Sequence, residues 1–417
     1  MADSNILKVA APALPFSDEL GEVLKTGAQA LLKAAIEAEV SDLLERYAAV
    51  QVDGKQAVVR NGYLPERTVQ TGLGDIPVKV PKVRDRSGQG VKFNSRLVPP
   101  YLKRTRAMEE FIPWLYLKGI STGDMQPALA TILGDDAKGL SPTTVGRLKA
   151  GWEADYDAWR KRDLSQRRFV YIWADGVHCN VRMDDRLCLL VIIGSDETGR
   201  KEVLAVHDGY RESADSWTEV LQQLTHQGLT CAPELAVGDG ALGFWTALAK
   251  QWPSIHHQRC WVHKTANVLN KLPRTVQPRV KQALRDIWMA PTRVDAEQAL
   301  ASCVAQFGDK YGKAMDCLVK DREDLLAFYD YPAAHWQHLR TTNPIESVFA
   351  TVRLRTDKVK NCGSRKTTLT MAWQLMTTAQ QRWRRLQGYK LLADVIEGVV
   401  FKDGERVEKE GQQQAAA

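Results

Sequence analysis

The sequence contains no apolar run long enough to cross a membrane. Its longest purely apolar stretch, Leu187 to Ile193, has seven residues, whereas a membrane-spanning helix needs about 20. The first twenty residues also lack the basic region followed by an apolar region that marks a secretory signal. We therefore expect a cytoplasmic protein without membrane attachment.

Cysteines are few, and their spacing shows no recognisable pairs. The chain has 7 of them, an odd number scattered from Cys179 to Cys362, and no two form a C-x-x-C pair. Disulfide frameworks are typical of small secreted domains with regularly spaced cysteines. We therefore expect reduced thiols.

Length and apolar content are sufficient for a large folded protein. The chain has 417 residues, of which 44% are hydrophobic. Such a chain can bury a sizeable core, and its length suggests two to four domains. These values exclude a fibre or a disordered tail.

Positive charge is concentrated in two segments. The net charge is +7, yet Asp53 to Arg106 carries +8 and Leu339 to Lys390 carries +9, so the rest of the chain carries −10. Clustered cations favour a polyanionic partner contacted in two places. Each segment taken alone could equally be a solvated face.

The N-terminal third predicts helices, a hairpin and more helices. Ser17 to Tyr47 has leucines near helical spacing, which indicates one or two amphipathic helices. Arg67 to Val83 alternates around a Gly-Leu-Gly-Asp turn and predicts a small basic hairpin. From Arg106 to about Arg160 the pattern is again helical, and the last helix begins at Ser141 as N-cap with Pro142 at its first position.

The two last helices of this region have the layout of a helix-turn-helix. The second helix would place four polar residues on its outer face, available to the major groove of DNA. These candidate DNA contacts are Thr143, Thr144, Arg147 and Lys149. The alternative is an ordinary packed helix pair.

The middle of the chain predicts a mixed sheet. Strand patterns at Phe169 to Gly176, Arg186 to Asp196 and Lys201 to Gly209 precede a helix, a short strand "ELAVGDG", a second helix and a possible fifth strand "SIHHQ". The order βββαβαβ suggests an α/β fold with helices packed on the sheet.

Two aspartates end predicted strands. Asp175 ends the first strand and Asp239 the fourth, and in such sheets ligands bind at the carboxyl ends of strands. Two neighbouring carboxylates repel each other unless a cation lies between them, and Mg²⁺ is the economical choice. Gly176 and Gly240 leave room beside each acid for a bulky backbone. The alternative is that each aspartate only starts a turn or caps a helix.

A third acid opens a later helix. In "TTNPIESVFATVRLRT" we expect Asn343 as N-cap, Pro344 at the first position and Glu346 at the third, where a glutamate often only completes a capping box. The constellation of two aspartates and this glutamate favours a functional role. Four further cations follow as candidate DNA contacts, namely Arg353, Arg355, Lys358 and Lys360.

Four sequence blocks resemble a known family. "YIWADGVH", "AVGDGALGFW", "HHQRCWVHKTANVLNKLP" and "TTNPIESVFATVR" look like the signature blocks of Mutator-like transposases of bacterial insertion sequences, which are DDE enzymes with an RNase H-like catalytic core. The resemblance covers about Arg60 to Phe401. It implies that Asp175, Asp239 and Glu346 are the metal-binding triad and that an all-helical domain is inserted before the glutamate. The pattern from Lys264 to Arg340 agrees, because it predicts helices and no strand.

The family also carries a Cys/His motif, which here is Cys260 and His263. The spacing of three places both on one helix face. Tetrahedral zinc needs two more ligands, and no second pair has the usual spacing. We expect His263 to lie near the catalytic centre, where it contacts DNA or orders the site, without a structural metal.

The function implied is that of a DNA transposase. We expect two Mg²⁺ (or Mn²⁺) ions on the triad, cleavage at terminal inverted repeats and transfer of the strand to target DNA, with a copy-out route through a circular intermediate as the resemblance implies. Joining two ends calls for at least a homodimer on DNA, and a bacterial cytoplasmic enzyme of this kind acts at the nucleoid. The alternatives are a DNA-binding regulator derived from an inactive transposase and a structure-specific metal-dependent nuclease.

The expected architecture is an RNase H-like mixed-sheet core interrupted by the helical insertion and preceded by an α-rich DNA-binding region. In chain order we expect N-terminal helices and a hairpin over 1–105, a helix-turn-helix-like domain over 106–163, the first part of the core over 164–265, the insertion over 266–338, the second part of the core over 339–401 and a flexible tail over 402–417.

Overall fold

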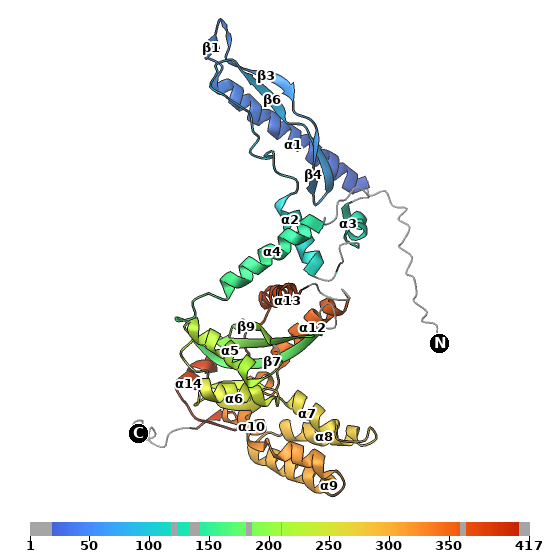
Figure 1. The fold of residues 1–417 in the computed structure, drawn as a ribbon, viewed down its shortest axis with the longest axis vertical. Coiled ribbons are helices and arrows are strands. Elements are labelled where there is room, and N and C mark those ends of the chain that lie inside the picture. Colours follow the sequence, from blue (N-terminus) through green and yellow to red (C-terminus); the bar gives the residue numbers. More distant parts are fainter. Residues whose placement is uncertain are drawn as a thin grey trace, which may run out of the picture. The chain divides into compact units, whose positions relative to one another are not determined.

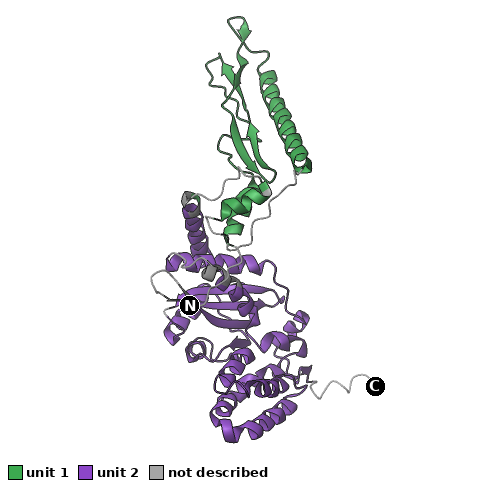
Figure 2. Cartoon of the chain, turned by 90° about the vertical axis from the view of Figure 1, so that its right-hand side faces the viewer, with its two compact units in different colours: residues 1–144 green, residues 145–417 purple. Residues whose placement is uncertain are grey.

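The computed structural model describes residues 19–117, 120, 124–133, 142–180, 186–209, 211–358 and 364–407. The chain divides into two compact units, residues 1–144 and 145–417, which Figure 2 distinguishes by colour. Each unit is described by itself. No helix among the described residues has both the length and the apolar character to span a membrane.

The first unit packs a long helix on short antiparallel strands (Figure 1). Helix α1 (Glu19–Arg46) confirms the predicted helical segment as one helix. Strands β4 (Arg67–Thr71) and β5 (Gly74–Val78) form the predicted hairpin. The end of that prediction is wrong, because β6 (Pro81–Asp85) leaves the hairpin and pairs with β3 (Val58–Tyr63).

The core of this unit lies between α1 and the strands. It includes Ile36 and Val40 of α1 together with Val69, Ile76 and Val78. A small two-stranded ribbon of β1 (Gln51–Val52) and β2 (Lys55–Gln56) was not predicted from the sequence.

Three helices follow, α2 (Arg106–Leu117), α3 (Met125–Leu133) and α4 (Pro142–Trp159). Helix α4 begins at Pro142 as predicted, whereas the predicted cap Ser141 lies outside the described residues. The division between the units falls inside α4. In the second unit the helix is fixed by Tyr156, whose hydroxyl donates to the Val206 carbonyl at 2.6 Å.

A five-stranded mixed sheet forms the centre of the second unit. Its strands are β7 (Phe169–Asn180), β8 (Arg186–Asp196), β9 (Lys201–Gly209), β10 (Leu235–Gly238) and β11 (His256–Arg259), in the order β11-β10-β7-β8-β9. Strands β7, β8 and β9 are antiparallel neighbours, while β10 runs parallel to both β7 and β11. With helices α5 (Ala214–His226) and α6 (Leu242–Gln251) between the strands, the predicted βββαβαβ order is confirmed.

Helices cover both faces of this sheet. On one face, α5 and α6 bury Trp217, Leu221 and Phe244 against alternate residues of the strands, such as Ile172 and Ile192. The remaining helices of the core, α12 (Asn343–Lys358) and α13 (Arg365–Gln380), contact β7 and β9 respectively. The sheet is therefore buried between two helical layers (Figure 1).

The segment between β11 and α12 is entirely helical, as predicted. It contains α7 (Trp261–Leu269), α8 (Gln277–Trp288), α9 (Arg293–Val319), α10 (Arg322–Leu326) and α11 (Trp336–Leu339), with two 3₁₀ turns, Ala327–Asp330 and Ala333–His335. After α13, a 3₁₀ turn (Tyr389–Leu391) and α14 (Leu392–Ile396) lead to a hairpin of β12 (Phe401–Lys402) and β13 (Glu405–Arg406). This hairpin reaches into the range predicted as a tail.

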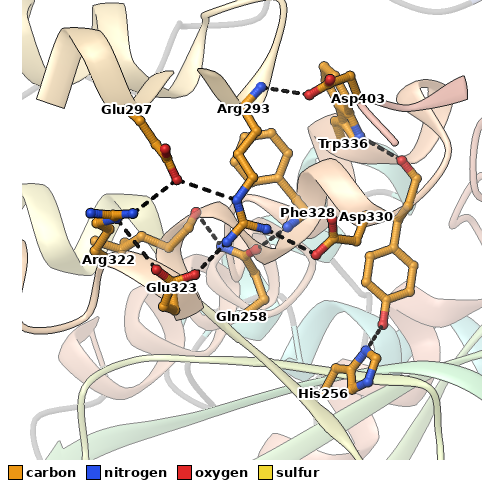
Figure 3. Close-up of polar contacts among 12 residues, drawn as sticks. His256, Gln258, Arg293, Glu297, Arg322, Glu323, Phe328, Asp330, Trp336 and Asp403 are labelled. Atoms are coloured by element: carbon orange, nitrogen blue, oxygen red, sulfur yellow. Dashed lines mark hydrogen bonds and ion pairs between the residues drawn. The ribbon is translucent and has the colours of Figure 1, made fainter. Parts of the chain in front are cut away.

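Polar contacts tie the helical insertion to the sheet (Figure 3). The Gln258 side chain of β11 accepts from the Phe328 N–H at 2.8 Å and donates to the Leu325 carbonyl at 3.1 Å. Next to it, the Arg293 guanidinium pairs with Glu323 at 2.5 Å and with Asp330 at 3.2 Å. The contacts of Gln258 thus fix the insertion against β11, the strand that precedes it in the chain.

Candidate active site

Strand register places Asp175 beside Asp239. In the parallel pair of β7 and β10, Ala174 lies opposite Gly238, and the next residue on each strand is an aspartate. The prediction that Asp175 ends its strand is wrong, because β7 continues to Asn180 along β8. The pairing of β7 with β10 stops at Ala174 and Gly238. Beyond this pair β7 has no neighbour strand on that side among the described residues, and the two aspartates lie there.

Asp175 is a buried carboxylate in an acidic environment. It is 7% exposed, and its Oδ1 accepts from the Gly176 N–H at 2.8 Å. Burial, together with the nearby carboxylates of Asp239 and Glu346, raises the pKa of Asp175 to about 6, although the His263 ring opposes this rise. The two aspartates and Glu346 therefore form one electrostatically coupled group.

Asp239 is held through its backbone. Its carbonyl accepts from the Trp245 ring N–H at 2.8 Å and from Arg259 Nη1 at 2.6 Å, and its Oδ1 accepts from the Ala241 N–H at 2.8 Å. Helix α6 begins after Ala241, so Asp239 starts a turn and does not occupy the N-cap position. For this aspartate the alternative of a helix cap is wrong, while the alternative of a turn start is confirmed.

Glu346 lies in the first turn of α12. The helix starts at Asn343, and the Thr342 carbonyl accepts from the N–H groups of Ile345 and Glu346. Thr342 rather than the predicted Asn343 therefore precedes the helix, a shift of one residue. The Glu346 carboxylate lies 3.3 Å from Thr342 Oγ1 as its acceptor, which orients it from its own helix start.

Cys260 and His263 lie against the acids. Cys260 immediately precedes α7 and His263 lies in its first turn, so only the histidine is on the helix proper. Ligand atoms of Cys260, His263 and Glu346 lie within 4.8 Å of one another. The Cys260 thiol, and the carboxylates of Asp175 and Asp239, raise the pKa of His263 to about 9 against the effect of burial. Its ring is therefore a cation at neutral pH.

A fourth carboxylate, Glu212, was missed by the sequence analysis. Burial and the charges of Asp239 and Asp175 raise the pKa of Glu212 to about 7, while His263 lowers it. Glu212 follows β9, which runs parallel to β7 and therefore ends at the same edge of the sheet. The sequence therefore held a signal for Glu212: it follows a predicted strand, and ligands bind at the carboxyl ends of strands in such sheets.

Comparison with known proteins identifies the family. The model of the Mutator family of transposases matches residues 4–385. The chain belongs to the Mutator family of transposases. It is therefore a DDE transposase, an enzyme that acts on DNA and uses a divalent metal ion.

Several curated relatives are similar over most of their length. The transposase of insertion sequence element IS6120 from Mycolicibacterium smegmatis is 48% identical over 303 residues, 72% of this chain and 93% of the relative. That of element IST2 from Acidithiobacillus ferrooxidans is 49% identical over 287 residues, 67% of this chain and 95% of the relative. That of element IS1201 from Lactobacillus helveticus is 29% identical over 347 residues, with 82% and 91% covered.

The donor set of the transposase fits a hard divalent cation. Four carboxylates, those of Asp175, Glu212, Asp239 and Glu346, interact electrostatically in one place. Carboxylate oxygens are the preferred ligands of Mg²⁺ and Mn²⁺. The Asp239 and Glu346 carboxylates raise the pKa of Asp175, and the Asp239 and Asp175 carboxylates raise that of Glu212, so a cation bound among them would relieve repulsion.

The candidate DNA contacts of the transposase are only partly described. On α4, Arg147 is exposed while Thr144 and Lys149 are half-buried, and on α12 Arg353 is exposed. The side chains of Thr143, Arg355 and Lys358, and the whole of Lys360, lie outside the described residues.

An open polar cavity adjoins the acids. It has a volume of about 370 Å³ and begins at Gly240, directly after Asp239. It is lined mostly by amide and amino groups from α7 and the turn after it and from the junction of α9 and α10, namely Lys264, Asn267, Asn270, Lys271, Lys320 and Asp321, with Cys317. Lys264 is paired with Asp321, whereas Lys271 and Lys320 are exposed at the surface.

Proposed function

We propose that this transposase binds the terminal inverted repeats of an insertion sequence and catalyses metal-dependent cleavage and transfer of DNA strands at Asp175, Asp239 and Glu346. The observation that carries the proposal is the convergence of these three acids from β7, the end of β10 and the start of α12. The strand order β11-β10-β7-β8-β9, with one antiparallel half and one parallel half, supports an RNase H-like core.

The three acids would hold two Mg²⁺ or Mn²⁺ ions. Such ions, when bound, supply a nucleophile from water at neutral pH and stabilise the charge on the phosphoryl group. The chain contributes positioning: Arg259 and Trp245 fix the backbone of Asp239, and Thr342 orients Glu346. His263 holds a proton beside the acids, which offsets part of their charge and makes the ring a donor toward a phosphate oxygen.

DNA binding would extend over several parts of the chain. We propose residues 1–105 and 106–163 as the parts that recognise the terminal repeat, and 339–401 as the basic second part of the core, after the insertion 266–338. The cavity beside Gly240 supports a path for the DNA backbone, because Lys271 and Lys320 offer cations and Asn267 offers an amide close to the acids.

Two ends must be held together for joining, so we propose a homodimer on DNA. A copy-out route through a circular intermediate, in the bacterial cytoplasm at the nucleoid, completes the proposal. The copy-out route and the location are what membership of the family implies. The relatives of this chain are transposases of insertion sequence elements.

The test replaces Asp239 by Asn and Glu346 by Gln, which keep size and hydrogen bonding but remove charge. Each change should abolish cleavage and joining of a paired-end DNA substrate while terminal-repeat binding persists, because removing an acid beside phosphates relieves repulsion. Asp215→Asn, an exposed acid in the first turn of α5, is the matched control.

Three results would contradict the proposal. Near-normal cleavage by Glu346→Gln would leave that residue with a capping role alone. Cleavage without joining by the unaltered protein would indicate a nuclease. Binding of terminal DNA with neither reaction, in the presence of Mg²⁺ or Mn²⁺, would indicate a regulator.

A further inference from the structure

Two glycines beside the aspartates make room for the segment around Glu212. A Cβ added to Gly176, the neighbour of Asp175, would lie 2.3 Å from Glu212 Oε1. A Cβ added to Gly243, in the first turn of the helix after Asp239, would lie 2.6 Å from the Glu212 carbonyl oxygen. Real Cβ contacts are not this short, so a side chain at position 243 would collide with the backbone at Glu212, and one at position 176 would displace the Glu212 carboxylate.

The space beside Gly176 therefore has an occupant within the chain. From the sequence, Gly176 was expected to leave room for a bulky backbone, but in the structure the Glu212 carboxylate fills that room. The side chain is half-buried and directed at the acid cluster, where it interacts with the charges of Asp175 and Asp239. A carboxylate placed beside other carboxylates costs free energy unless a cation joins them.

Glu212 and Glu346 come from opposite layers of the core. Glu212 directly precedes Ser213, the N-cap of α5, and α5 packs on the sheet face that buries Ile172 and Ala174. Glu346 starts α12, which contacts β7 as part of the other layer. Asp175, on β7 itself, lies between the two glutamates. Asp175 thus interacts electrostatically with a glutamate from each layer.

We propose that Glu212 is a fourth carboxylate ligand of the divalent metal centre, acting directly or through a metal-bound water. This inference rests on the proposed function, since it assigns Glu212 to the same site. The competing role is structural: Glu212 Oε1 lies 4.0 Å from His178 Nε2, and the two residues could simply form an ion pair.

The experiment measures binding of Mn²⁺ alone to the full-length protein by isothermal titration calorimetry, without DNA. Glu212→Gln keeps the shape and removes the charge. We expect Mn²⁺ affinity to fall about tenfold or more, in the range typical of lost groups around a metal. Asp215→Asn, three residues further along and exposed, should bind Mn²⁺ like the unaltered protein. The melting temperature of metal-free Glu212→Gln should rise, because one of four repelling charges is gone.

A second variant covers the case in which Glu212→Gln does not fold. Gly176→Ala leaves every charge in place but puts a methyl group where the Glu212 carboxylate lies, so it should also weaken Mn²⁺ binding. His178→Gln tests the structural role. If this variant reproduces the effect of Glu212→Gln on Mn²⁺ affinity, Glu212 serves as an ion-pair partner and the inference is overturned.

The two proposals can fail separately. If Asp175→Asn and Asp239→Asn lose Mn²⁺ binding while Glu212→Gln retains it, the triad stands and Glu212 is not a ligand. If none of the three variants loses Mn²⁺ binding, the metal site itself is misplaced and the proposed function falls with it.

Discussion

The raised pKa of Asp175 predicts that an inactivating substitution stabilises the metal-free protein. The ordinary value is 3.8 and the folded value about 6, a difference of about 3 kcal/mol between the ionised carboxylate in the folded and unfolded chains. Asn at this position carries no charge and can still accept from the Gly176 N–H. Asp175→Asn should therefore raise the free energy of unfolding by up to about 3 kcal/mol at pH 8.

The sign of the pH dependence follows from the direction of this shift. Because the pKa is higher in the folded protein, the ionised form of Asp175 costs stability above pH 6, and the cost disappears as the pH falls toward 3.8. The advantage of the variant should thus be about 3 kcal/mol at pH 8 and about half of that at pH 5. Saturating Mn²⁺ should reverse the order, because only the unaltered protein gains binding energy.

The assay is urea unfolding in EDTA, followed by tryptophan fluorescence, with and without Mn²⁺ in place of the chelator. Asp215→Asn serves as the control and should differ from the unaltered protein by less than about 0.5 kcal/mol at either pH. The reasoning fails if Asp175→Asn is no more stable than the unaltered protein at pH 8, or if its advantage does not shrink at pH 5.

Four further predictions concern the surroundings of the acids. His263→Gln should lower the melting temperature in EDTA, because the folded protein raises the pKa of this histidine. This drop in melting temperature should be largest below pH 6.5 and should vanish above about pH 9. Arg259→Ala should lower the free energy of unfolding in urea by about 3 kcal/mol or more, because the Asp239 carbonyl and the Asp321 carboxylate would lose this partner. The double variant Lys271→Ala, Lys320→Ala should weaken terminal-repeat binding in fluorescence anisotropy and reduce the salt slope by about 2. The mass of the complex with paired DNA ends, measured by light scattering, should correspond to at least two protein chains. A complex of one protein chain that still joins the ends would contradict this.

The sequence predicted the sheet well because its signals are local. Strand β8 (Arg186–Asp196) and strand β9 (Lys201–Gly209) were predicted to the residue, since apolar β-branched runs bounded by a polar turn specify strands directly. The end of β7 was not, because pairing with β8 extends the strand five residues past Asp175. A single strand does not reveal how far each of its neighbours follows it.

The site was predicted where strand ends mark it and missed where a loop supplies it. Asp239 follows a buried strand and Glu346 opens a helix, and both patterns are visible along the chain. Glu212 lies in the loop between the end of β9 and Ser213, and the strand-end pattern marks it as well once β9 is placed parallel to β7. The opposing glycines give the same information, but only in three dimensions.

The helical insertion contributes to the candidate active site, because its acids hold the arginine that fixes the backbone of Asp239. Strand β10 has only four residues, and Asp239 lies just beyond its last pair. Arg259, which holds the Asp239 carbonyl, is in turn held by Asp321 and Asp324 at 3.9 and 3.8 Å, and both of these acids lie in the insertion. Lys264 of α7 pairs with the same Asp321. These charges link the start of α10 to the backbone of a catalytic candidate, so a movement of α10 against the sheet would displace the Asp239 backbone.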